Sequence, residues 1–75
     1  QDLNANKYYI ETLLVLCEKE NRNCSLCRER INDMILNHSD DADLHKLKAN
    51  LLLISGDTLS AAIEMEKAEQ LLFAN

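Results

Sequence analysis

Residues 42–75 constrain the fold of this chain more than any other stretch. Apolar residues recur there every three or four positions on both sides of Gly56, which is the only glycine in the chain. This spacing is typical of amphipathic helices, and a glycine followed by aspartate favours a tight turn between them. Small residues stand among the apolar ones at Ala49, Ala61 and Ala68. Antiparallel helices joined by a short turn approach closely where small side chains face each other, so the stretch predicts a helical hairpin.

This hairpin resembles a tetratricopeptide repeat, a family whose period is 34 residues. If Ala42 is taken as position one, small or bulky apolar side chains fall where the family has them; these residues are Ala49, Leu52, Ala61, Met65 and Ala68. The chain departs from the family pattern at three positions, His45, Lys48 and Phe73, where an aromatic residue or leucine, a leucine and a proline are usual.

Residues 7–41 resemble a second, degenerate repeat, and residues 1–6 form a polar extension before it. The inner face of its first helix repeats at i, i+3, i+4 and i+7, with Ile10, Leu13, Leu14 and Cys17. The inner residues of its second helix are Cys24, Cys27, Ile31 and Met34. Asn21 and Asn23 tolerate left-handed backbone conformations, so residues 21–23 are expected to form the turn. The registers of the two repeats agree if this turn is one residue longer than the turn at Gly56.

The expected fold is therefore all-α, with four helices in two stacked antiparallel hairpins, a fragment of a tetratricopeptide-like α-solenoid. The absence of proline agrees with helices. The net charge of −5, from 13 acidic and 8 basic residues, argues against nucleic acid or an anionic membrane as a partner. No run approaches the roughly 20 apolar residues of a membrane span, and the start resembles no signal peptide. Because it also lacks an initiator methionine, we expect either a processed chain or, ahead of that, a piece of a longer protein.

Three cysteines, an odd number, favour a reducing intracellular compartment, the cytoplasm ahead of the nucleus. Cys24 and Cys27 have the spacing of a redox or zinc motif, but no strand precedes them and the histidines do not complete a zinc-finger pattern. We expect them, with Cys17, to act as small apolar core residues. His45 is expected to be packed and hydrogen-bonded. No set of nucleophile, base and acid emerges, so we expect no enzyme activity, no metal and no cofactor.

The resemblance implies a concave groove lined by the first helix of each hairpin, which would bind a peptide or helix of another protein. The candidate groove residues are Tyr8, Glu11, Val15, Asp43, Lys46, Asn50 and Leu53, with Glu18, Lys19 and Ile54 at the remaining positions. Lys46 and Asn50 also resemble a pair with which chaperone-binding relatives hold a C-terminal carboxylate, although the rest of that clamp is missing.

The last helix supplies a second candidate surface through Leu71, Leu72 and Phe73. A free helix end should not expose such residues, so we expect it to meet another repeat, a second copy of the chain or a bound helix. The alternative function is therefore a helical dimerisation or bundle domain that associates through this helix. A thiol or zinc protein is the third class.

Overall fold

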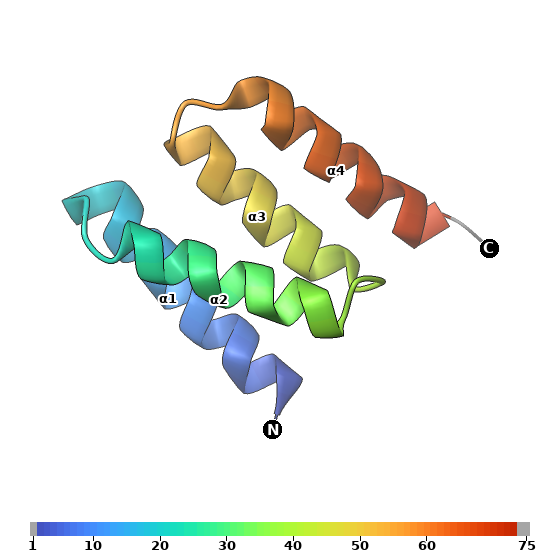
Figure 1. Ribbon diagram of the computed structural model, residues 1–75, viewed down its shortest axis with the longest axis horizontal. Coiled ribbons are helices and arrows are strands. Elements are labelled where there is room, and N and C mark those ends of the chain that lie inside the picture. The colour runs from blue at the N-terminus through green and yellow to red at the C-terminus, as the bar shows by residue number, and fades with distance from the viewer. Residues whose placement is uncertain (1, 74–75) are drawn as a thin grey trace.

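Four α-helices form nearly all of the chain that the structure, a computed structural model, describes, namely residues 2–73 (Figure 1). They are α1 (Leu3–Glu20), α2 (Cys24–Asn37), α3 (Ala42–Ile54) and α4 (Thr58–Phe73). No strand occurs within residues 2–73. The prediction of an all-α fold with four helices in hairpins is confirmed; the ends of the predicted units, residues 1 and 74–75, lie outside the described residues. None of these helices combines the length and the apolar character needed to cross a membrane.

The helix starts follow from side-chain caps. α1 begins at Leu3, inside the predicted polar extension, because the Asp2 carboxylate accepts a hydrogen bond from the backbone N–H of Asn4 at 3.0 Å. Asp41 caps α3 in the same way and accepts from the backbone N–H groups of Asp43 and Leu44 at 3.0 and 3.3 Å. Each cap satisfies donors that have no partner inside the helix.

The two hairpin turns are closed by residues with positive φ. Asn21 and Asn23 have φ values of 53° and 61°, which confirms the left-handed conformations expected there, and Gly56 has a φ of 86°. Residues 21–23 separate α1 from α2 and residues 55–57 separate α3 from α4, so the first turn is not longer than the second. The expectation of an extra residue is wrong because two left-handed asparagines close the first turn without a glycine.

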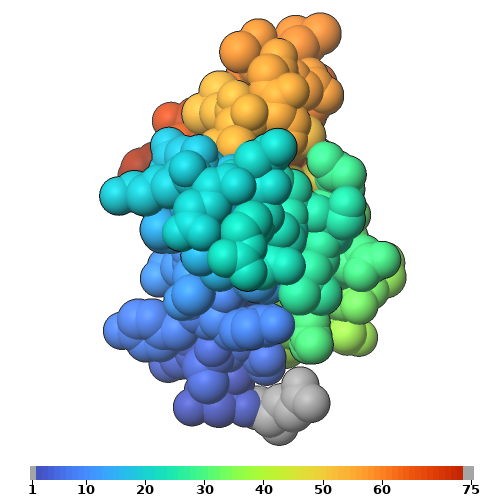
Figure 2. Space-filling view, turned by 90° about the vertical axis from the view of Figure 1, so that its left-hand side faces the viewer, coloured from blue at the N-terminus to red at the C-terminus, as the bar shows by residue number. Residues whose placement is uncertain are grey.

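Helix α3 lies at the centre of the arrangement. It packs against α1 and α2 on one side and runs alongside α4 on the other (Figure 1). Both hairpin turns lie at the same end of the molecule, which faces the viewer in Figure 2. The main core is made by α1, α2 and α3 through Ile10, Leu13, Leu14, Cys17, Cys27, Ile31, Leu44, Leu47 and Leu51.

The second interface, between α3 and α4, is built on small residues. Ala49, Ala61 and Ala68 are all fully buried. Small side chains let helix backbones approach closely, so this burial is what the sequence pattern predicts for a tight hairpin.

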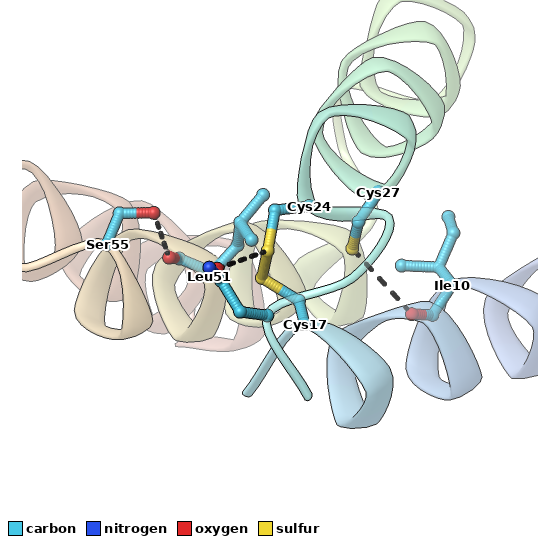
Figure 3. The surroundings of a disulfide bond; sticks show 7 residues. Ile10, Cys17, Cys24, Cys27, Leu51 and Ser55 are labelled. Carbon is cyan, nitrogen blue, oxygen red and sulfur yellow. Dashed lines mark hydrogen bonds between the residues drawn. A yellow bond between two sulfur atoms is a disulfide. The ribbon is translucent and has the colours of Figure 1, made fainter. Parts of the chain in front are cut away.

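A disulfide joins Cys17 of α1 to Cys24 of α2 across the first turn, with 4.9 Å between their Cα atoms (Figure 3). The interpretation of Cys17 and Cys24 as free core residues is therefore wrong: the turn brings the end of one helix and the start of the next within bonding reach. Cys27 remains a free buried thiol, and its Sγ lies 3.9 Å from the carbonyl oxygen of Ile10. Because disulfides persist mainly in oxidising compartments, the cysteines no longer support a reducing one.

Reduction of this disulfide should destabilise the protein. The bond closes a short loop, because its two cysteines are seven positions apart in the sequence, and the chain-entropy model assigns such a loop about 2–3 kcal/mol of unfolding free energy. We expect thermal unfolding, followed by circular dichroism, to shift downward by roughly 10–20 °C in dithiothreitol. A Cys17→Ala/Cys24→Ala variant should show no response to the reductant. An unchanged transition in wild-type protein whose bond is shown by mass to be broken would contradict the expectation.

Candidate functional site

A hollow of about 510 Å³ lies between α1 and α3, and we call it the groove. Helix α1 contributes Glu11, Leu14, Val15 and Glu18 to its lining. Helix α3 contributes Leu47, Asn50, Leu53 and Ile54. The first helix of each hairpin thus supplies one wall.

Most of the residues that the sequence assigned to a groove line this hollow together. They are Glu11, Val15, Glu18, Asn50, Leu53 and Ile54. Tyr8 lines an adjoining hollow of about 400 Å³ with Asn4, Lys7 and Glu11, so Glu11 belongs to both.

The remaining candidates lie elsewhere. Asp43, Lys46 and Lys19 line neither hollow. Asp43 is exposed, and its carboxylate lies 3.2 Å from Lys7 Nζ. Lys46 and Asn50 therefore do not share the groove lining, which removes support from a carboxylate clamp made by this pair.

The groove has an apolar floor with open apolar edges. Leu14 and Leu47 are buried at its base, whereas Val15 and Leu53 remain 50% and 52% exposed. Polar groups are few: the carboxylates of Glu11 and Glu18 and the amide of Asn50. Such a lining can take up an apolar side chain and orient it by a small number of polar contacts.

An ion-pair cluster around Lys7 lies beside the adjoining hollow that Tyr8 lines. Lys7 Nζ of α1 lies 2.8 Å from Asp41 Oδ2, while the other oxygen of Asp41 caps α3. The hydrogen bond to Asp41 raises the pKa of Lys7. Burial would raise the pKa of Asp41, but hydrogen bonds from Lys7 and the backbone outweigh it and hold that pKa below its ordinary value. The start of α3 and the first turns of α1 are thereby held together.

His45 forms a buried polar cluster between α3, α4 and the loop before α3. Its Nδ1 lies 2.8 Å from Glu64 Oε1 and its Nε2 lies 2.8 Å from the carbonyl oxygen of Ser39. The second oxygen of Glu64 accepts a hydrogen bond from Lys67 at 3.2 Å. Both ring nitrogens of His45 face acceptors, so only the imidazolium form donates to both. The prediction of a packed, hydrogen-bonded histidine is confirmed.

Glu64 is the residue that sequence reasoning missed. It is only 7% exposed, although a glutamate on an amphipathic helix is ordinarily read as facing solvent. The sequence did contain a signal for this contact. If Ala49 faces Ala61 in the antiparallel hairpin, then His45, one turn before Ala49, lies opposite Glu64, one turn after Ala61.

The apolar residues at the end of α4 do not form one patch. Leu71 lines a hollow with Ser39, His45, Lys67 and Gln70. Phe73 is 80% exposed and lines a different, open hollow with Glu66, Glu69 and Gln70, and Leu72 is half-exposed.

The cysteines and the other potential metal ligands of the described residues do not form a metal-binding or dithiol site. Among the described residues, no three His, Cys, Asp or Glu side chains are grouped so that they could hold a metal ion. Cys24 is bonded to Cys17, so the spacing of Cys24 and Cys27 is not used for a dithiol pair in this structure. Burial raises the pKa of the Cys27 thiol, which keeps it in its less nucleophilic form.

The His45–Glu64 pair should make stability depend on pH on the acidic side. Burial would raise the pKa of Glu64, but hydrogen bonds from His45 and Lys67 outweigh it and lower that pKa from the ordinary value of 4.5. The stabilisation that depends on the ionised Glu64 carboxylate is therefore present above about pH 4.5 and is lost as the pH falls through the lower, folded pKa of Glu64. We expect Glu64→Gln to reduce the unfolding free energy at pH 7 on the order of 2 kcal/mol, and the difference to shrink at acidic pH.

Urea unfolding at a series of pH values measures this difference. Glu66→Gln, an exposed change on the same helix, is the matched control and should have little effect at any pH. A Glu64→Gln deficit of equal size at neutral and acidic pH would contradict the role assigned to the charge.

No family model matches this chain, and comparison with curated proteins and with solved structures returns no significant match.

Proposed function

We propose that this chain is a non-catalytic protein-interaction module that binds a peptide or helix of another protein in the groove between α1 and α3. The observation that carries the proposal is the lining of the groove, in which Val15 and Leu53 remain half-exposed at the edges of a buried apolar floor. Apolar side chains left open to water in a concave surface gain free energy when a partner covers them.

We also propose that the two hairpins are arranged as in tetratricopeptide repeats. Three features support it: the hairpin turns lie at one end of the molecule, the first helix of each hairpin lines the groove, and Ala49, Ala61 and Ala68 are buried between helices. A groove of this kind takes up an extended or helical segment by apolar anchors, while polar groups set its orientation. The acidic net charge makes nucleic acid and anionic membranes poor partners.

Selection from a random peptide library tests the groove. Peptides enriched on the wild-type protein should lose roughly 5- to 30-fold in affinity for a Val15→Ser/Leu53→Ser variant, because the change removes apolar surface worth about 1–2 kcal/mol on binding. Leu36→Ser is the matched control, since Leu36 is 82% exposed on α2 and lines no part of the groove. Circular dichroism establishes that the variants remain folded. Peptides that bind all three proteins equally would place the interaction elsewhere.

A second candidate function, self-association through α4, is favoured by a separate observation. Leu59, Ile63 and Phe73 share one face of α4 and are all at least half-exposed. Met65 is also 41% exposed, whereas Ile31, at the corresponding place in α2, is fully buried under α3. The outer side of α4 thus offers apolar surface that a second copy of the chain could cover.

Sedimentation equilibrium distinguishes the two candidates. If α4 mediates dimerisation, the wild-type protein should be dimeric at micromolar concentration and Leu59→Ser/Phe73→Ser should weaken the dimer at least tenfold, whereas Val15→Ser/Leu53→Ser should not. A monomer at all concentrations up to the millimolar range would rule out the α4 candidate and leave the groove proposal in place.

A further inference from the structure

The charges around the groove indicate which kind of segment it accepts. We infer that the groove takes an amphipathic segment in which an apolar side chain is flanked by two basic residues. This inference rests on the proposed function, because it specifies the chemistry of the segment that the groove would bind.

Two carboxylates flank the apolar part of the groove, and no lysine or arginine within residues 2–73 lines it. Glu11 and Glu18 are both exposed, and no ion pair joins either of them to another described residue. Lys7, which lies one turn before Glu11 on α1, is already engaged by Asp41 and Asp43 at 2.8 and 3.2 Å. The groove therefore presents negative charge that the chain itself does not neutralise.

The spacing of these carboxylates defines the segment further. Glu11 and Glu18 are seven residues apart on α1, so they lie on one face and are separated by roughly 10.5 Å along the helix. Val15 lies between them on that face and is half-exposed. A partner helix with basic residues at i and i+7 and an apolar residue between them has the same spacing.

Charge complementarity of this kind selects partners more than it adds affinity. Exposed ion pairs are individually weak, and two of them together distinguish a basic from an acidic segment by about tenfold. The net charge of −5 acts in the same direction, since it speeds the encounter with a basic segment at low salt. The half-exposed side chains of Val15 and Leu53 supply the remaining binding free energy when a partner covers them.

The test uses two synthetic helical peptides with the same apolar face. One carries lysine at i and i+7, and the other carries glutamate at both positions. Fluorescence anisotropy measures the dissociation constant of each peptide at 0.05 and 0.15 M salt. We expect the lysine peptide to bind the wild-type protein at least tenfold more tightly than the glutamate peptide. In Glu11→Lys/Glu18→Lys the preference should reverse.

A charge-matched control separates the groove from net charge. Glu66→Lys/Glu69→Lys makes the same change in net charge on the far helix, α4, and should leave the preference for the lysine peptide within threefold of the wild-type value. Equal affinity of the wild-type protein for both peptides, no binding of either peptide, or an equal loss of preference in this control would overturn the inference.

The outcomes also distinguish this inference from the function on which it rests. If both peptides bind equally well and Val15→Ser/Leu53→Ser weakens both, the groove proposal stands and the charge inference fails. If the lysine peptide is preferred but Val15→Ser/Leu53→Ser has no effect on its binding, the contact is purely electrostatic and both fail.

Discussion

Helix α3 has to bury two faces at once, and the rest of the structure depends on this requirement. Leu44, Leu47 and Leu51 face the core that α3 forms with α1 and α2. His45 and Ala49 are buried as well, on the side where α4 packs with Ala61, Ala68 and Glu64. A helix covered on two sides has only a narrow exposed strip, and in α3 that strip carries Asn50 and Leu53, which line the groove.

Three specific links hold the helix pairs around α3, and each has a different chemistry. The disulfide ties α1 to α2 at the end where the turns lie. The Lys7–Asp41 ion pair ties α1 to the start of α3, and the His45–Glu64 pair ties α3 to α4. Hydrophobic burial is non-directional, so it gives these helices cohesion without fixing their register. Specific polar and covalent links of this kind define which residues meet, and thereby the shape of the groove.

Much of the fold could be predicted from the sequence because the apolar spacing is regular. Ile10, Leu13, Leu14 and Cys17 are all buried, as their positions on one helical face indicate. The groove lining was assigned through the resemblance to a tetratricopeptide repeat rather than through apolar spacing, and six of the residues assigned in this way line the hollow between α1 and α3. The start of α1 could not be predicted from apolar spacing, because Asn4 and Asn6 are polar and the helix begins at the cap formed by Asp2.

The remaining features depend on contacts between elements. A sequence does not show whether a cysteine is bonded or free. The pairing of Cys17 with Cys24 therefore could not be predicted without knowing how closely the first turn brings the ends of α1 and α2 together. Glu64 looked like any exposed acid until the hairpin placed it opposite His45. The side chains of Lys46 and Asp43 likewise could not be placed from spacing alone, because the partner that fixes Asp43 is Lys7 on another helix.

The position of α4 at the edge of the bundle means that cooperativity is not uniform across the molecule. Among the described helices, α4 packs against α3 alone and contributes nothing to the main apolar cluster. Separation of α4 would break its interface with α3 and the His45–Glu64 pair, but it would leave the apolar cluster of α1, α2 and α3 and the disulfide intact. The cross-linked hairpin together with α3 is therefore the part of the molecule whose core does not depend on α4.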